Sequence, residues 1–364
     1  MKVLHVINSL DIGGAQTLLT DSLPRFVEKK VESEVFVLKK SSEGNFEEIL
    51  KSKGINIIYS QVEQIYSPLQ ILELKRLIQQ NSYDIVHSHT FPSQYWVSLL
   101  KNLIKKPPVF ITTEHNTSNR RREKKVFKYL DKFIYRNYRH IVCISEGTLS
   151  ELITWVSDVK PKSSVIENGI DLKKLTVASP LNPKDIIPNY QDGDKIIVMV
   201  ARLTEQKDHK TVIQAASKLP SNMHIVFVGG GEKYSEYEAI IKQNNLESQV
   251  HLLGPRKDVP NIIKAADLFV LSSHFEGFGL VVVEAMASGI PVIGSDVTGL
   301  TDVVSGAGKL FQQGDSQELA NIIIELVNHP EMCTAMIEAG YKKSSLYSIE
   351  RFVDEHMKLY QSLL

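Results

Sequence analysis

Two glutamates bracket a glycine-containing turn in the second half of the chain. Glu276 directly precedes Gly277, and Glu284 follows Gly279 within an apolar, helix-like segment. A carboxylate can accept hydrogen bonds from two vicinal hydroxyls, and the free N–H groups at a helix start attract a phosphate. The spacing therefore indicates a diphosphate lying between one carboxylate that binds a ribose diol and another that binds a sugar hydroxyl. Taken alone, the segment is more typical of a surface loop with incidental acids.

Two basic residues that could meet such a diphosphate follow an earlier apolar run. Arg202 and Lys207 lie in 200–208, between a strand-like and a helix-like segment. Arg can bind phosphate as a bidentate fork and Lys as a point charge. Fixed cations there would stabilise the negative charge that develops on a departing diphosphate. Each residue alone could also be a solvated loop residue.

Two further turns follow strand-like runs in the same half. The segment 229–232 reads Gly-Gly-Gly-Glu and is no phosphate-binding P-loop, because no Gly-Lys-Ser/Thr follows it. Gly230 is nevertheless a candidate for binding the same ligand. The turn 254–258 contains Arg256, and we expect its backbone to contact a nucleotide base, with a plain surface turn as the alternative.

Both halves of the chain alternate short apolar runs with helix-like stretches. This alternation predicts parallel strands joined by right-handed helical crossovers. We therefore predict an α/β chain with two doubly wound, Rossmann-like domains, 1–175 and 195–348, joined by a proline-containing linker at 176–194. The segment 349–364 has helical spacing and could either end the second domain or cross back to the first. The strands predicted in the first half are 3–7, 34–38, 55–59, 85–87, 109–112 and 140–144.

Composition places the chain among ordinary globular proteins. Hydrophobic residues make up 43% and charged residues 23% of the 364 residues. The two cysteines, Cys143 and Cys333, are far apart within apolar runs, which favours reduced thiols. The N-terminus has no secretion-signal pattern, and no apolar run is long enough to span a membrane. We expect a cytoplasmic protein.

The net charge of zero hides an asymmetry between the halves. Residues 1–180 carry 26 Lys and Arg against 19 Asp and Glu, whereas 181–364 carry 16 against 23. Nine basic residues lie in 120–139, among apolar residues at helical spacing. This segment indicates either an amphipathic helix packed on the sheet or peripheral contact with an anionic membrane surface at the inner face of the cell membrane. We expect no nucleic-acid partner, because the second half is acidic and no known module is present.

In combination, these motifs resemble family 4 of the retaining glycosyltransferases, and the similarity runs over nearly the whole chain. The resemblance implies the GT-B architecture, in which two nucleotide-fold domains face a cleft and the second holds most of the donor. It also implies that 349–364 crosses back to the first domain. The segments that carry it are 202–207, 229–232, 253–254, 272–280, 284–289 and 291–293.

The resemblance assigns roles to residues of the second domain. Glu276 would meet the transferred sugar and Glu284 the ribose, while Arg202 and Lys207 would hold the diphosphate. The backbone amides that would bind the diphosphate belong to Gly277, Phe278, Gly279 and Leu280.

In the first domain, the resemblance singles out three places. Gly13 and Gly14 match a glycine-rich loop that closes over the donor phosphate, and His115 matches a histidine placed against the sugar at the reaction centre. Asn168 lies in the segment that leads to the linker and is counted with the donor-binding residues. One departure is Gln16, which stands where many relatives have an acid, and another is 298–302, which lacks a second Gly-Gly-x-x-Glu motif.

The function that this resemblance implies is a retaining transfer of a hexose or N-acetylhexosamine. The donor would be a nucleotide-diphosphate sugar, with UDP expected, and the acceptor a sugar or a lipid-linked saccharide in cell-surface polysaccharide biosynthesis. Alternatives are a sugar-nucleotide epimerase on the same fold and a non-catalytic subunit that only binds a sugar nucleotide. The candidate catalytic residues are His115, Glu276, Arg202 and Lys207.

We expect no metal and no cofactor besides the donor. His87 and His89 have a metal-like spacing, but the sequence offers no third ligand near them. Asp192 and Asp194 resemble a metal-binding pair, but they precede a strand and are interpreted as solvated turn residues.

Overall fold

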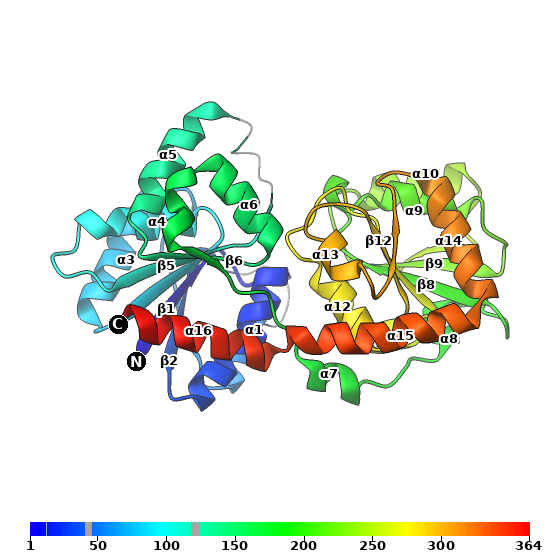
Figure 1. Ribbon diagram of the computed structural model, residues 1–364, viewed down its shortest axis with the longest axis horizontal. Coiled ribbons are helices and arrows are strands. Elements are labelled where there is room, and N and C mark those ends of the chain that lie inside the picture. Colours follow the sequence, from blue (N-terminus) through cyan, green and yellow to red (C-terminus); the bar gives the residue numbers. More distant parts are fainter. Residues whose placement is uncertain (12, 41–45, 118–121, 123) are drawn as a thin grey trace. The chain divides into compact units, whose positions relative to one another are not determined.

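The structure is a computed structural model that describes residues 1–364 except 12, 41–45, 118–121 and 123. The chain forms two compact units (Figure 1). The first unit contains Met1–Ile170 and Ile349–Leu364, and the second contains Asp171–Ser348. Each unit is a doubly wound α/β domain, which confirms the predicted fold class.

The first unit is built on a parallel sheet of seven strands among the described residues. Its strand order is β3-β2-β1-β4-β5-β6-β7, so the chain starts near the middle and winds outward in both directions. Ligands of such sheets gather where the winding reverses, here at the carboxyl ends of β1 and β4. The strands are β1 (Lys2–Ile7), β2 (Glu32–Val37), β3 (Asn56–Tyr59), β4 (Ile85–His89), β5 (Val109–Glu114), β6 (His140–Cys143) and β7 (Ser163–Val165).

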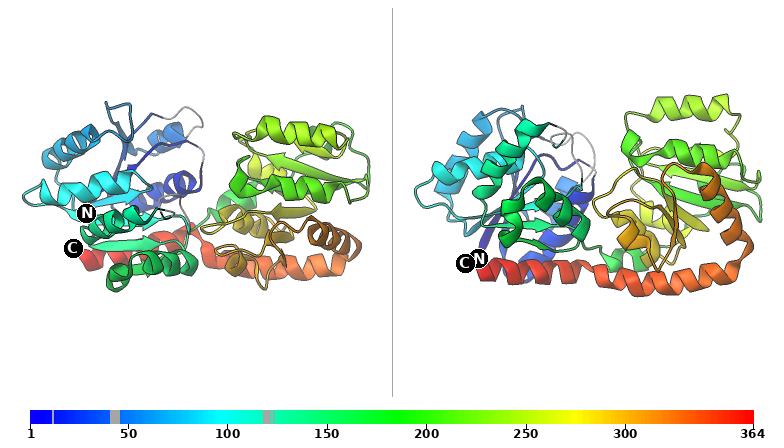
Figure 2. Two further views of the ribbon diagram at one scale, coloured as in Figure 1. Left: turned by 90° about the horizontal axis from the view of Figure 1, so that it is seen from above. Right: turned by 45° about the horizontal axis from the view of Figure 1, so that its top comes forward.

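Helices cover both faces of this sheet (Figure 2). One hydrophobic core includes residues of α3, α4, α5 and α6, and a second includes residues of α1, α2 and α16. The helices are α1 (Gly14–Glu28), α2 (Phe46–Ser52), α3 (Leu69–Gln80), α4 (Ser93–Leu99), α5 (Lys125–Arg136), α6 (Glu146–Trp155) and α16 (Ile349–Leu363), with 3-10 turns η1 (Leu100–Asn102) and η3 (Ser157–Lys162).

The C-terminal helix α16 packs against α1 in the first unit. Its buried residues recur at helical spacing, so one stripe of the helix enters the core. Ion pairs flank this stripe, from Arg25 to Glu350 and from Lys29 to Asp354. The stripe consists of Ile349, Phe352, Val353, His356 and Tyr360.

The second unit repeats the same winding with six parallel strands among its residues, in the order β10-β9-β8-β11-β12-β13. The winding reverses between β8 and β11. The strands are β8 (Lys195–Val200), β9 (Met223–Val228), β10 (Val250–Leu252), β11 (Leu268–Leu271), β12 (Val292–Ser295) and β13 (Lys309–Phe311). The helices are α7 (Leu172–Val177), α8 (Pro183–Ile186), α9 (His209–Ala216), α10 (Tyr234–Gln243), α11 (Val259–Lys264), α12 (Leu280–Ala287), α13 (Thr301–Val304), α14 (Ser316–Asn328) and α15 (Pro330–Ser344), with 3-10 turns η4 (Glu205–Lys207) and η5 (Ser345–Tyr347).

The segment predicted as a linker, 176–194, differs from a loose connection. It contains α8, and the whole stretch from Asp171 belongs to the second unit. The side chains of Ile186 and Ile187 are buried, and Lys264 donates hydrogen bonds to the carbonyls of Thr176 and Ala178. These apolar and backbone contacts attach the segment to the second unit although its sequence has little periodicity.

None of the helices in the described part of the chain combines the length and hydropathy that a membrane span requires.

Candidate functional site

The second unit brings four of the predicted residues to the carboxyl ends of β8 and β11. Arg202 and Lys207 follow β8, and Glu276 and Gly279 follow β11. These neighbouring strand ends form the point where the winding of the sheet reverses. Open α/β sheets bind their ligands at this point, so the fold itself favours a ligand site here.

Lys207 and Glu276 form an ion pair at this sheet edge, with the lysine Nζ on Oε1 of the glutamate. The Ser273 hydroxyl donates a second hydrogen bond, of 2.6 Å, to the same oxygen. Glu276 is only 7% exposed, so its charge depends on these partners. In turn, the Ser295 hydroxyl on β12 donates to the Ser273 carbonyl. The Glu276 carboxylate is therefore held by residues at the carboxyl ends of three neighbouring strands, β8, β11 and β12.

The loop that carries Lys207 is anchored to the end of β11. The buried Ser272 hydroxyl donates to the carbonyls of Lys207, at 3.0 Å, and Asp208, at 2.9 Å. Asp208 has a left-handed φ of 49°, and its side chain accepts from the Thr211 N–H to begin α9. The backbone N–H of His274 also donates to the Gln206 carbonyl. These bonds fix Lys207 beside Glu276.

The start of α12 supplies the predicted phosphate-binding backbone. Gly279 is its N-cap, with a φ of 83°, and a Cβ there would come within 2.9 Å of a Leu300 methyl. Glycine therefore relieves both backbone strain and crowding at this position. The Phe278 side chain is buried, and the centroids of the Phe278 and Tyr347 rings are 5.1 Å apart, so Phe278 is a core residue. Glu284 is half-buried within α12.

The glycine turn after β9 supports the loop that carries Arg202. A Cβ on Gly229 would lie 2.1 Å from the Ala201 carbonyl oxygen, and one on Gly231 would lie 2.3 Å from that of Leu203. Leu203 also donates its N–H to the Gly230 carbonyl. The glycines are thus required by close backbone packing. The Arg202 side chain is exposed and makes no ion pair with the described residues.

In the turn after β10, the Arg256 side chain is engaged within the turn itself. Its Nε and Nη2 donate to the two oxygens of Asp258, at 2.8 and 2.6 Å. This bidentate pair raises the pKa of Arg256 and lowers that of Asp258. A role in binding a base, as predicted from the sequence, would therefore fall to the backbone of the turn. The Gly229 N–H donates to the Gly254 carbonyl, which joins this turn to the glycine turn.

The remaining predicted residues belong to the first unit. Gly13 is the N-cap of α1, which begins at Gly14, and a Cβ on Gly13 would lie 2.6 Å from the Gln16 side-chain oxygen. Asn168 is buried, and its side-chain oxygen has no hydrogen-bond partner among the described residues.

His115 directly follows β5, at the same edge as the other strand ends. Its buried Nε2 has no partner within the described part of the chain, and burial lowers its pKa to about 4. The imidazole is therefore neutral near pH 7. The preceding residue, Glu114, is 4% exposed and accepts from Gln94 and Tyr135, at 2.7 and 2.6 Å. Glu114 thus holds the strand end that carries His115, a role that the sequence did not indicate.

The premise of the no-metal prediction for His87 and His89 is wrong. The structure supplies a third imidazole, His5, from the neighbouring strand β1. The sequence could not show this, because His5 is more than eighty positions away and only the pairing of β1 with β4 brings it close. Burial lowers the pKa of His5 to about 3 and those of His87 and His89 well below the usual value.

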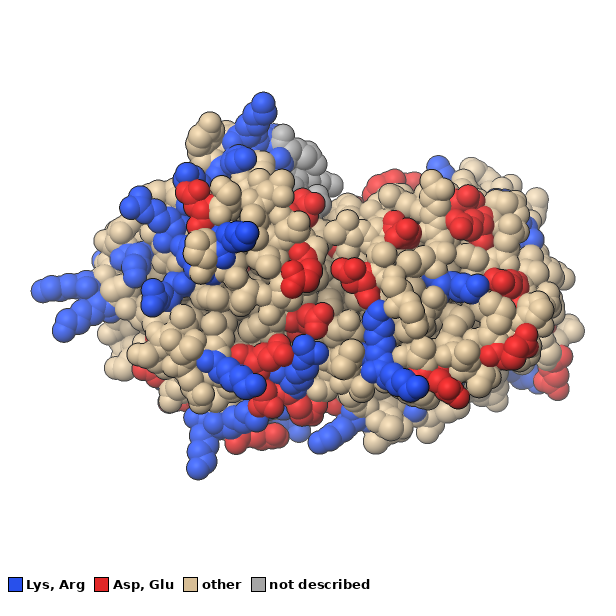
Figure 3. Space-filling view, viewed as in Figure 1, with Lys and Arg blue, Asp and Glu red and all other residues tan. Residues whose placement is uncertain are grey.

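Helix α5 is amphipathic and exposes a stripe of apolar side chains. The sequence left open whether this segment packs on the sheet or contacts a membrane surface. Ile134 and Tyr135 are buried in the first unit. In Figure 3, Lys and Arg side chains gather over the part of this unit that holds α5. Val126, Tyr129, Leu130 and Phe133 are between 41% and 78% exposed.

Comparisons with known proteins agree with this geometry. Residues 12–174 match the family described as Glycosyltransferase Family 4, and residues 184–343 match Glycosyl transferases group 1. The UDP-Gal:alpha-D-GlcNAc-diphosphoundecaprenol alpha-1,3-galactosyltransferase of Escherichia coli is 28% identical over 304 residues, which cover 80% of this chain and 78% of that protein. The putative glycosyltransferase EpsF of Bacillus subtilis is 26% identical, with coverages of 81% and 79%.

Solved structures show the same fold. Anabaena Alr3699/HepE in complex with UDP and glucose superposes with a TM-score of 0.86 at 21% identity, covering 100% of both chains. Sucrose-phosphate synthase from Thermosynechococcus elongatus gives a TM-score of 0.84 at 20% identity, with 100% and 98% coverage. The two matched families together span most of the chain, so this protein belongs to the family 4, group 1 glycosyltransferases and has their GT-B architecture.

Proposed function

We propose that this glycosyltransferase transfers a hexose or N-acetylhexosamine from a UDP-sugar to a saccharide or lipid-linked saccharide, with retained configuration and without a metal, in cell-surface polysaccharide biosynthesis. The observation that carries the proposal is the Lys207–Glu276 pair at the β8–β11 strand ends, next to the N-terminus of α12. Two relatives support the donor and acceptor: one is named for UDP-Gal and a diphosphoundecaprenol acceptor, and another was solved with UDP and glucose.

In this proposal the diphosphate binds the start of α12 and the cations of the β8 loop. Lys207 and Arg202 stabilise the charge that the departing UDP gains as the glycosidic bond breaks. Because a nucleoside diphosphate is already a good leaving group, no acid is required to protonate it, unlike in a glycosidase. Glu276 then binds a hydroxyl of the transferred sugar, and Glu284 binds the ribose.

The acceptor attacks from the face that the leaving phosphate vacates, which retains the configuration. Neutral His115 can accept a hydrogen bond from the sugar without adding charge. The anomeric proton coupling in the NMR spectrum of the product tests retention, and an inverted product would refute it. Turnover that requires added Mg²⁺ or Mn²⁺ would refute metal independence.

The main experiment measures nucleotide release from a panel of UDP- and GDP-sugars, with and without lipid extract as a source of acceptor. We expect UDP release that depends on the extract. Conversion of the UDP-sugar without an acceptor would instead support an epimerase, and tight binding without turnover would support a non-catalytic subunit.

The division of labour between the two glutamates is tested by Glu276→Ala and Glu284→Ala. The first should abolish transfer but keep or strengthen UDP binding, because it frees Lys207 from its ion pair. The second should weaken UDP itself by about 10-fold, the equivalent of one lost hydrogen-bonded contact. Glu247→Ala, at an exposed position, is the control. Equal loss of UDP affinity in both variants would contradict the assignment.

The exposed stripe of α5 supports peripheral contact with anionic lipid, as the lipid-linked acceptor would require. Its four apolar residues recur at helical spacing and lie among Lys128, Lys132 and Arg136, which are also exposed. Apolar insertion and lysine attraction then act together at the membrane surface. The protein should co-sediment with vesicles that contain phosphatidylglycerol. The double variant Tyr129→Ser with Phe133→Ser should reduce the fraction of protein that co-sediments. Equal binding to neutral vesicles would refute the electrostatic part.

A further inference from the structure

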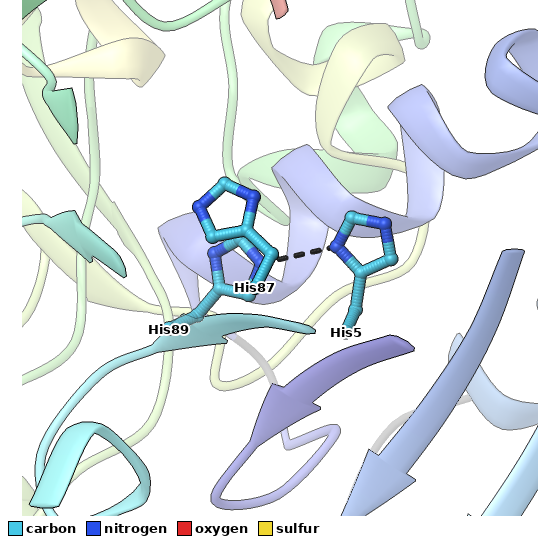
Figure 4. Close-up of side chains that lie close together, drawn as sticks. All are labelled: His5, His87 and His89. Atoms are coloured by element: carbon cyan, nitrogen blue, oxygen red, sulfur yellow. Dashed lines mark hydrogen bonds between the residues drawn. The ribbon is translucent and has the colours of Figure 1, made fainter. Parts of the chain in front are cut away.

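Three buried histidines of the first unit lie beside one another on one face of the sheet (Figure 4). His5 of β1 is paired in register with His87 of β4. His87 and His89 are two residues apart on the same strand, so their side chains point to the same face. One ligand atom from each of the three imidazoles lies within 4.8 Å of the other two.

The distances suit a shared metal ion. His5 Nδ1 and His89 Nε2 are 3.2 Å apart. Two nitrogens bound to one tetrahedral Zn²⁺ at about 2.0–2.1 Å are separated by about 3.4 Å, so little movement is needed. The rings of His87 and His89 stack with their centroids 4.3 Å apart. The ligand nitrogens of the trio His5, His87 and His89 lie within 4.8 Å of one another, so His87 must move closer to share the ion.

The third histidine already has an outer partner of the kind that metal ligands use. His87 Nδ1 is 2.7 Å from the Tyr360 hydroxyl, and its Nε2 is 2.7 Å from the Thr113 hydroxyl. A metal-bound imidazole typically keeps one nitrogen on such a partner, which orients the ring. His87 can therefore exchange one of these hydrogen bonds for a metal bond and retain the other.

The His5–His89 contact also permits this exchange without loss of a proton. In the metal-free protein, one proton lies between these two nitrogens. His5 Nε2 has no partner among the residues that the structure describes. If the proton belongs to His5, it can move to Nε2 by a change of tautomer, which leaves both facing nitrogens as lone-pair donors to the metal.

A small cavity adjoins the cluster. It has a volume of about 10 Å³, is lined by all three imidazoles, and is bounded by Leu18 and Phe26. This is room for roughly one water-sized body. The lining also contains His115, His356 and hydroxyl groups, and the three neutral nitrogens of the trio form a donor set that Zn²⁺ and similar ions prefer.

We propose that His5, His87 and His89 bind one divalent transition-metal ion of the Zn²⁺ class, which stabilises the first unit. The three ligands all belong to the first unit, and the candidate catalytic residue His115 lines the same cavity. The proposal does not depend on the donor or the reaction. A metal that binds only the folded chain raises its stability by mass action. Tyr360, on α16, would then connect the C-terminal helix to the metal through His87.

The second unit contains a natural control. His224 Nδ1 and His251 Nε2 are also 3.2 Å apart, but they are not part of a group of three metal-ligand side chains among the described residues. If the His5–His89 contact is only a hydrogen bond between imidazoles, it should bind metal no better than the His224–His251 contact does. If the three histidines form a metal site, substitution of His5 or His89 should weaken metal binding and substitution of His224 should not.

The experiment uses the full chain, stripped of metal with a chelator and then titrated with Co²⁺ or Zn²⁺. We expect one ion per chain, with the intense visible absorption of tetrahedral Co²⁺. X-ray absorption of the Zn²⁺ form should show a nitrogen and oxygen shell at about 2.0–2.1 Å with three imidazoles. Fluorescence of Trp96 and Trp155, both in the first unit, should show a higher unfolding midpoint with Zn²⁺.

The variants test which residues are responsible. His5→Gln and His89→Gln should each weaken binding by more than about 100-fold, and Tyr360→Phe by about 10- to 100-fold. His224→Gln should bind as the unchanged protein does. Absence of stoichiometric binding, a metal shell with sulfur or fewer than three imidazoles, or loss of binding in His224→Gln would overturn the proposal. The absorption spectra of the unchanged protein decide the matter even if a variant fails to fold.

Discussion

The three consecutive glycines after β9 should respond very differently to alanine substitution. Gly229 and Gly231 have φ angles of 144° and 158°, and an added Cβ would lie 2.1 and 2.3 Å from carbonyl oxygens of the β8 loop. An ordinary carbon–oxygen contact is about 3.3 Å, so the two backbones would have to separate by about 1 Å. At Gly230, the backbone φ is not positive, and the Cβ would lie 3.0 Å from a ring carbon of Pro255.

The expected cost follows from these two contributions. Overpacking against backbone costs about 1–3 kcal/mol, and a strained φ adds about 1–3 kcal/mol. Gly229→Ala and Gly231→Ala should therefore each lower the free energy of unfolding of the second unit by about 2–6 kcal/mol. Gly230→Ala should cost about 1 kcal/mol or less. Gly254→Ala isolates the backbone contribution, because its φ is 67° but no heavy atom lies within 4 Å of the added Cβ.

Hydrogen exchange measured by mass spectrometry is the suitable assay, because both tryptophans lie in the first unit and a two-unit chain need not unfold in one step. Peptides covering 195–233 should exchange fastest in Gly229→Ala and Gly231→Ala. UDP affinity should fall with them, since the displaced loop carries Arg202. Equal costs at all three glycines, or costs below about 0.5 kcal/mol at Gly229 and Gly231, would refute the reasoning.

Three further predictions concern stability. Burial, with a smaller contribution from Lys207, lowers the pKa of His209 to about 3, so the folded second unit does not bind a proton that the unfolded chain accepts near pH 6.5. The free energy of unfolding should therefore be highest above pH 6.5 and fall by up to about 1.4 kcal/mol per pH unit below it. In urea titrations followed by circular dichroism, His209→Gln should reduce this pH dependence. Ser272→Ala should lower the free energy of unfolding by about 1–3 kcal/mol, because it removes the hydroxyl that is hydrogen-bonded to the Lys207 and Asp208 carbonyls. It should also weaken UDP binding measured by calorimetry. Unchanged UDP affinity would show that the Ser272 hydroxyl does not position Lys207. On α16, Val353→Ala should lower the free energy of unfolding, measured by tryptophan fluorescence, by about 2–3 kcal/mol, because Val353 is buried. Glu350→Gln removes an exposed ion pair and should lower it by less than about 1 kcal/mol. The reverse order would mean that the ion pair rather than apolar packing holds the helix.

Much of the fold could be predicted, because the alternation of apolar runs and helical stretches is a local signal. The central strands β1, β4 and β5 of the first sheet agree closely with their predicted ranges. The strand β7 was missed because Ser163–Val165 has only one apolar residue and owes its strand conformation to pairing with β6. The segment 176–194 was predicted as a linker because Ile186 and Ile187 give no periodic pattern, although both are buried.

Local sequence also determined the glycine turns, the acids and the cations at the strand ends of the second unit. Their spacing along the chain was enough to predict that they follow successive strands. Only the tertiary structure decided that Lys207 pairs with Glu276, sixty-nine positions away. The pairing of Arg256 with Asp258 is a local contact within one turn that was not predicted from the sequence. The assignment of a sugar contact to Glu276 and a ribose contact to Glu284 stays a prediction.

The histidines of the first unit show the same division most clearly. The sequence by itself indicated only the two-residue spacing of His87 and His89, because the predicted strand 85–87 ends at His87. The structure extends β4 to His89, so that both side chains lie on one face of the strand. The sequence could not indicate His5, because a parallel sheet joins strands that are distant in the chain, and strand order and register depend on the packing of the whole unit. Short-range pattern therefore specified which elements form and what they carry, whereas the pairing of distant strands decided which of those side chains meet.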